Sequence, residues 1–106
     1  MFVIVAQWYA KEGKEHEVAA LASQMISHAR AEPGCRLFMV NQHAEDRRRF
    51  VLYEQFVDRT AFEAHTQTPA FKELVVGRIV PLLESRVRDV FHLIEPAAEA
   101  MPPRVH

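Results

Sequence analysis

The feature that most constrains this 106-residue chain is a set of strand-like segments with apolar side chains on both faces. Side chains alternate between the two faces of a β-strand. In the segment 2–10, one face would carry Phe2, Ile4, Ala6 and Trp8, and the other Val3, Val5 and Tyr9. The segments 49–57 and 85–95 repeat this pattern. A sheet with one solvated face would show polar residues there, so both faces of this sheet need a cover.

Helical patterns separate these strands. Between residues 14 and 32, apolar side chains recur at i, i+3, i+4 and i+7, which predicts an amphipathic helix that Pro33-Gly34 ends. A strand over 35–42 follows and forms a hairpin with 49–57. Asp58 is a suitable N-cap for a short helix over 59–66, and Thr68-Pro69 begins another helix that runs to about residue 83. The order β-α-β-β-α-α-β predicts an α+β, ferredoxin-like fold with a four-stranded antiparallel sheet.

The length suits one compact domain, expected over residues 1–96. The ending has three prolines after residue 95 and no hydrophobic period, so residues 97–106 are expected to form a C-terminal tail or a dimer arm. Cys35 is the only cysteine, which excludes an internal disulfide and fits a reducing compartment. No segment reads as a signal peptide or a membrane span, so we expect a cytoplasmic protein.

The two-sided sheet also predicts a partner. Helices cover only one of its faces, and the simplest cover for the other is the same face of a second copy. We therefore expect a homodimer with sheet-to-sheet packing. The net charge of −1 and the scattered basic residues argue against nucleic-acid and membrane partners.

His65 is the first candidate for chemistry. It follows Ala61 and Phe62 at helical spacing, and the Thr68-Pro69 break places it in the last turn of the short helix. Carbonyl groups at that end favour the protonated imidazole and apolar neighbours favour the neutral one, which suits a general base. A histidine satisfied by a backbone carbonyl would give the same pattern.

Glu54 is the second candidate, because it interrupts an apolar strand on the face assigned to the helices. A buried carboxylate needs a partner. It could orient His65, bind a substrate, or form an ion pair with Arg86 or Arg88.

Aromatic residues on these strands and helices could line a flat pocket for a small hydrophobic or aromatic ligand, or could belong to the core. The candidates for substrate binding are Trp8, Phe38, Phe56, Phe62 and Phe71. The six histidines show no i, i+4 pair, and no CxxC or glycine-rich phosphate loop occurs. We therefore expect no metal and no nucleotide cofactor. Cys35 has no histidine or acid at a telling spacing and is read as a small buried side chain.

Three motifs occur in order: EPGC at 32–35, FVLYEQFVD at 50–58 and AFEAHTQTPAF at 61–71. Together they resemble the antibiotic biosynthesis monooxygenase (ABM) domain family, and the resemblance runs from Met1 to about Pro96. It implies a dimeric α/β barrel with a pocket between sheet and helices in each copy. His65 matches the histidine of the family's A-x-x-x-H-x-x-x-P segment, and Glu54 matches the acidic position of the third-strand motif.

The resemblance implies a monooxygenase that oxidises a small aromatic, quinol or polyketide-like substrate with molecular oxygen and no other cofactor. Haem-degrading relatives look as though they use an asparagine and a histidine where Ala6 and Val75 stand, which argues against haem. Two alternatives stay open. One is an isomerase or other proton-transfer enzyme of the type that processes a quorum-sensing signal, using the same His65. The other is a non-catalytic dimeric domain that binds a small molecule.

Overall fold

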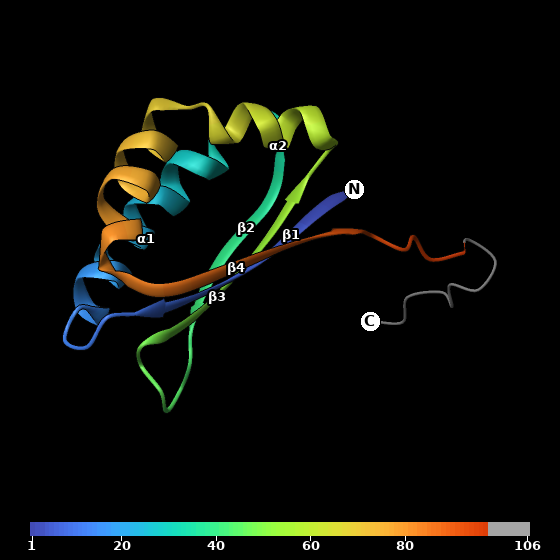
Figure 1. The fold of residues 1–106 in the computed structure, drawn as a ribbon. Helices are drawn as coiled ribbons and strands as arrows, with labels where there is room; N and C mark the ends of the chain where they lie inside the picture. The colour runs from blue at the N-terminus through green and yellow to red at the C-terminus, as the bar shows by residue number, and fades with distance from the viewer. Residues whose placement is uncertain (98–106) are drawn as a thin grey trace, which may run out of the picture.

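The computed structural model describes residues 1–97 (Figure 1). The tail or arm expected over 97–106 lies outside the described residues except for Ala97. The elements are β1 (Phe2–Ala10), α1 (Glu15–Arg30), β2 (Cys35–Gln42), β3 (Arg49–Phe56), α2 (Arg59–Thr66), the π-helix η1 (Phe71–Ile79), the 3₁₀ turn η2 (Val80–Leu82) and β4 (Leu83–His92).

The four strands form one antiparallel sheet in the order β2-β3-β1-β4. The two long-range neighbours of β1 are therefore β3 and β4, and β4 is an edge strand. This arrangement confirms the α+β, ferredoxin-like prediction. The dimeric barrel stays a prediction.

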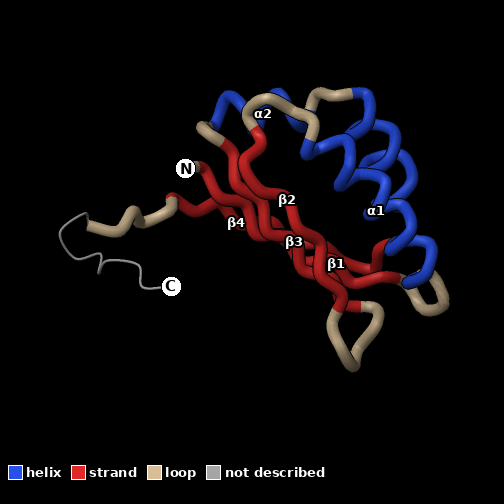
Figure 2. Tube along the Cα trace, turned by 180° about the vertical axis from the view of Figure 1, so that it is seen from behind, coloured by secondary structure: helices blue, strands red, loops and turns tan. Residues whose placement is uncertain are grey.

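All helices lie on one side of the sheet (Figure 2). The β1 side chains that point toward them are buried, as expected from the alternation: Phe2, Ile4, Ala6, Trp8 and Ala10. On β3, the inward side chains Phe50, Leu52 and Phe56 are likewise buried, and α1 contributes Val18, Leu21, Ala22, Met25 and Ala29. Alternation along the strands thus sets which residues form the core.

The other face of the sheet carries apolar side chains, and no helix within residues 1–97 covers them. Val87 is 55% exposed, Phe91 49%, Met39 42% and Val51 39%. The strand register places Val51 and Val87 on either side of Gln7, and it places Phe91 beside Val3. These residues share the outer face, because directly paired residues point to the same side of a sheet.

The segment after Pro69 differs from the regular helix that the sequence predicts. Its start is as expected, because the Phe71 amide donates to Thr68 Oγ1 at 3.1 Å. From Phe71 the backbone forms a π-helix, and at its end the Val80 amide donates to the carbonyl of Val75, five residues back. Wider turns still bury Leu74, Val75 and Ile79, and β4 begins at Leu83, two residues earlier than predicted.

No helix within residues 1–97 combines the length and the apolar character that crossing a membrane requires.

Candidate functional site

A cavity of about 290 Å³ lies between the inner face of the sheet and the helices. Each of the four strands and the helices α1, α2 and η1 contributes side chains to its wall. Small residues leave the space open: Ala6 on β1 and Ala22 on α1 both line it. Val75 lines it from η1.

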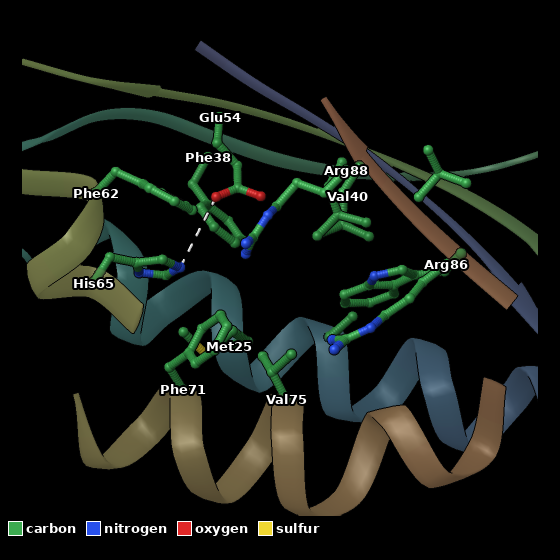
Figure 3. A pocket seen from close by; sticks show the side chains of 15 residues that line it. Met25, Phe38, Val40, Glu54, Phe62, His65, Phe71, Val75, Arg86 and Arg88 are labelled. Carbon is green, nitrogen blue, oxygen red and sulfur yellow. Dashed lines mark ion pairs between the residues drawn. The ribbon is translucent and has the colours of Figure 1, made fainter. Parts of the chain in front are cut away.

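His65 points into this cavity and is only 2% exposed (Figure 3). Asp58 caps the start of α2: its Oδ1 atom accepts a hydrogen bond from the Ala61 amide at 2.8 Å, so the N-cap prediction is confirmed. At the other end, the hydroxyl and the amide of Thr68 both donate to the carbonyl of His65, at 3.0 and 3.3 Å. The backbone on both sides of His65 is therefore fixed, and its ring is held in the last turn of the helix.

The imidazole is held by a carboxylate that the sequence analysis missed. His65 Nδ1 lies 2.9 Å from Glu32 Oε1 and 3.0 Å from Glu32 Oε2. A carboxylate accepts the Nδ1 proton, so the lone pair of the neutral ring is on Nε2, the nitrogen that faces Glu54. Glu32 stands 33 residues before His65, in the EPGC motif. That motif was the available signal, but only the fold shows what Glu32 contacts.

Glu54 lies on the other side of the ring. Its Oε1 atom is 3.9 Å from His65 Nε2, and the residue is 5% exposed. Burial raises the pKa of the Glu54 carboxyl to about 8; nearby Arg88 lowers it, and Glu32 raises it further. Glu54 therefore carries a proton at neutral pH and can donate a hydrogen bond into the cavity. At 3.9 Å it is too far to hold the imidazole by a hydrogen bond, and Glu32 makes that contact instead.

Four of the five aromatic candidates line the cavity: Trp8, Phe38, Phe62 and Phe71. The fifth candidate, Phe56, is not among the residues that line it. Phe56 is fully buried behind the wall, where its ring centroid lies 5.1 Å from that of His65 and 5.5 Å from that of Phe62. Its role in the structure is to support these two rings from behind.

Two arginines complete the wall from β4. Arg86 is paired with Trp8 and Arg88 with Ala6, so both side chains project from the inner face of the strand (Figure 3). From the sequence, they are expected only as ion-pair partners for Glu54. No ion pair among residues 1–97 involves either guanidinium.

Other reactive groups lie apart from this arrangement. No cluster of three or more His, Cys, Asp or Glu side chains that could hold a metal ion forms within residues 1–97. Burial raises the pKa of the Cys35 thiol, with further contributions from Glu32 and Glu54, so the reactive thiolate is disfavoured. The chemistry that the cavity offers is therefore an oriented imidazole, a neutral carboxyl group and two guanidinium groups around an apolar space.

A family model described as antibiotic biosynthesis monooxygenase matches residues 1–76. Among curated proteins, an uncharacterized protein from Synechocystis, sll1783, is 32% identical over 73 residues. This match covers 69% of the chain, and the chain spans about half the length of that relative.

Solved structures share the fold. SO0527 from Shewanella oneidensis is 30% identical with a TM-score of 0.81, over 87% of this chain and 89% of its own. A crystal structure of an antibiotic biosynthesis monooxygenase is 24% identical with a TM-score of 0.83, over 90% and 100% of the two chains. Rv0793 from Mycobacterium tuberculosis is 24% identical with a TM-score of 0.82, over 92% and 98%. At 24% identity, the last two show the fold alone.

Proposed function

This chain belongs to the antibiotic biosynthesis monooxygenase family, and from that premise we propose that it is a cofactor-independent monooxygenase. Its substrate would be a small aromatic, quinol or polyketide-like molecule, and molecular oxygen would be the co-substrate. The observation that carries the proposal is a buried imidazole whose Nδ1 is held by Glu32 and whose other nitrogen faces an open, aromatic cavity.

His65 would act as the general base. A phenol or enol hydroxyl placed beside Nε2 would give its proton to the ring, and the charge that forms on the imidazole would be stabilised by the Glu32 carboxylate. The resulting anion is the electron donor for O₂. One oxygen atom enters the substrate and the other leaves as water, with the electrons coming from the substrate.

Glu54 would supply the acid. Its carboxyl group is protonated at neutral pH and sits on the opposite side of the imidazole from Glu32. It can donate a hydrogen bond to a substrate oxygen, or a proton to the oxygen atom that leaves. The two carboxyl groups therefore have separate tasks, which follow from their different exposure: 17% for the Glu32 side chain and 7% for that of Glu54.

The cavity wall supports the proposal in a second way. The rings of Phe38, Phe62 and Phe71 lie between 5.2 and 6.2 Å from the His65 ring, measured between centroids. Flat apolar walls suit an aromatic substrate and exclude water from the anion until O₂ reacts with it. An open cavity also favours a small-molecule enzyme over a domain whose interior is filled by its own side chains.

Oxygen uptake tests the proposal. Purified protein would be mixed with a panel of quinols, naphthols and anthrones in an oxygen electrode, with ¹⁸O₂ used to follow the label into the product. We expect uptake above the spontaneous rate with at least one substrate, and one labelled oxygen atom per product. His65→Ala should lose this uptake, because the general base is removed. His16→Ala, which changes an exposed histidine on α1, is its matched control and should keep it. Turnover of a sugar-derived ketone without oxygen uptake would instead support the isomerase alternative.

We also propose that the protein functions as a homodimer in which two sheets pack through their outer faces. The exposed apolar residues Met39, Val51, Val87 and Phe91 support this arrangement, because they lie on the face that the helices leave bare. Each copy would keep its own cavity on the opposite side of its sheet.

A further inference from the structure

We propose that the cavity selects planar aromatic substrates that carry a carboxylate group, and that Arg86 and Arg88 bind this carboxylate at the cavity mouth. The inference rests on the proposed function, because it names the substrate class of the same cavity. It starts from two guanidinium groups that line an otherwise largely apolar space.

The strand register brings the two arginines together. Both are on the inner face of β4, two residues apart, so their Cα atoms are about 7 Å apart. Both are exposed, since β4 is the edge strand, while their neighbours in the wall, Trp8 and Ala6, are buried. The arginines therefore mark the side on which the cavity meets solvent.

Arg88 is held in place by an aromatic ring. Its Cζ atom lies 5.2 Å from the centroid of Phe62, and the Phe62 centroid is 6.2 Å from that of His65. This stacking directs the guanidinium along the cavity wall and leaves its N–H groups available to a ligand. A planar molecule between the aromatic walls would thus meet a cation at one end and the imidazole at the other.

The acidic groups near the cavity do not neutralise these cations. Glu32 is engaged with His65, and Glu84, on β4 itself, pairs with Arg48 at 3.3 Å. The Glu54 carboxyl is neutral at pH 7. Asp89 lies beside Arg88 in sequence and so points to the outer face. Two like charges side by side at a cavity mouth favour the binding of an anion between them.

A carboxylate on an aromatic ring fits these features better than other anions. Its two oxygens match the paired N–H groups of a guanidinium, and its flat apolar body matches the phenylalanine walls. Charged side chains on an edge strand also discourage pairing with another sheet, but that role does not require them to line a cavity. With the carboxylate at the arginines, the acidic hydroxyl of the substrate would lie toward His65.

Calorimetric binding with two matched ligands tests the inference. 6-Hydroxy-2-naphthoate and 6-hydroxy-2-naphthamide share the ring system and the hydroxyl group and differ in charge. We expect the wild-type protein to bind the naphthoate at least about tenfold more tightly than the amide. Arg86→Gln and Arg88→Gln should each reduce naphthoate affinity about fivefold and leave amide affinity almost unchanged.

Arg59→Gln is the matched control, because Arg59 also lies over a phenylalanine ring, 4.9 Å from the Phe2 centroid, but does not line the cavity. Arg59→Gln should keep the wild-type preference for the naphthoate over the amide. Arg86→Lys and Arg88→Lys should keep most of this preference, and raised salt should reduce it. Equal affinity for the two ligands in the wild type, or a preference for a small sugar phosphate over the naphthoate, would overturn the inference.

These results separate the inference from the proposed function. Selective naphthoate binding without oxygen uptake from any quinol or naphthol would contradict the monooxygenase proposal and leave the anion site standing. Oxygen uptake with neutral substrates that neither arginine substitution changes would support the monooxygenase proposal and contradict the anion site.

Discussion

Three side chains in a row, Glu32, His65 and Glu54, lead from the turn after α1 to the interior of the cavity. The first is partly exposed and contacts the imidazole directly, at 2.9 Å. Glu54, the last of the three, is buried, and burial keeps its carboxyl group protonated at neutral pH. The same residue type thus provides a negative charge on one side of His65 and a neutral hydrogen-bond donor on the other, because burial differs.

Glu32→Gln should separate orientation from substrate binding. The amide oxygen can still accept from Nδ1, but the negative charge that stabilises the protonated ring is lost. We expect turnover to fall about 10- to 100-fold while KM changes little, because Glu32 does not line the cavity. Steady-state kinetics of Glu32→Gln beside Glu17→Gln, an exposed glutamate on α1, would measure this. Wild-type turnover in Glu32→Gln would contradict the role given to Glu32.

Glu54 should make stability depend on pH. Between the ordinary value of 4.5 and about 8, the folded protein holds a proton on Glu54 that the unfolded chain has released. The free energy of unfolding should therefore fall as pH rises through this window, by up to about 1.4 kcal/mol per pH unit, and level off above pH 8.

Glu54→Gln removes the titrating group and should flatten that dependence. Urea unfolding between pH 5 and 9 would measure the difference between the two proteins. If the free energies of unfolding of the wild type and Glu54→Gln change in parallel across this pH range, the pKa of Glu54 is not raised.

At this scale, part of the site could be predicted from the sequence. His65 and Glu54 stand out because each interrupts an apolar pattern, and both are buried at the cavity. Glu32 gives no such signal, since its contact with His65 depends on how the turn after α1 packs against α2. The position of Phe56 behind the cavity wall could not be predicted, because alternation gives the face of a strand and not the depth behind a neighbouring side chain.

At the scale of the elements, Glu32 reaches His65 because the turn between α1 and β2 packs against the helix α2. Gly34 in this turn lies directly against α2, and its carbonyl accepts the Val57 amide at 2.9 Å. A Cβ atom added at Gly34 would clash with the Cβ of Ala61. The close approach of turn and helix therefore requires a glycine here.

Gly34→Ala should push α2 away from the turn. We expect a loss of about 1–3 kcal/mol in the free energy of unfolding, as in other overpacked sites, together with reduced turnover as Glu32 and His65 separate. The double variant with Ala61→Gly relieves the clash. Chemical denaturation of the two single variants and the double variant gives the coupling energy. If the effects of the two substitutions on the free energy of unfolding simply add, the contact between Gly34 and Ala61 is not tight.

The order of elements is predictable from the sequence because each strand and helix has its own period and clear end signals, such as Pro33-Gly34 and the Asp58 cap. The π-helix is not. The apolar positions of Phe71, Val75 and Ile79 fit either kind of helix, and the choice depends on tertiary packing, chiefly against α1. The cavity is equally hard to predict from the sequence, since it depends on which small residues face one another in the fold.

For the whole molecule, the two faces of the sheet have different tasks. The inner face forms the core and the cavity, while the outer face exposes the apolar side chains on which the proposed dimer depends. This division would keep the cavity away from the proposed contact between copies.

Val51→Glu should break the dimer. A charge at the centre of the outer face would be buried without a partner if two sheets packed there. We expect light scattering to show the wild type as a dimer and Val51→Glu as a folded monomer at micromolar concentration. Val76→Glu, at a residue 50% exposed on η1, should remain a dimer. A monomeric wild type would contradict the sheet-to-sheet arrangement.

The central claim is that His65 takes a proton from an aromatic hydroxyl inside the cavity. It can be tested without the natural substrate, by the absorbance of a bound nitrophenol whose neutral and anionic forms differ in colour. At a pH where the free nitrophenol is mostly neutral, the wild-type protein should bind it as the nitrophenolate, and His65→Ala should bind it as the neutral phenol. Neutral nitrophenol in the wild-type cavity, or equal ionisation in both proteins, would contradict the account.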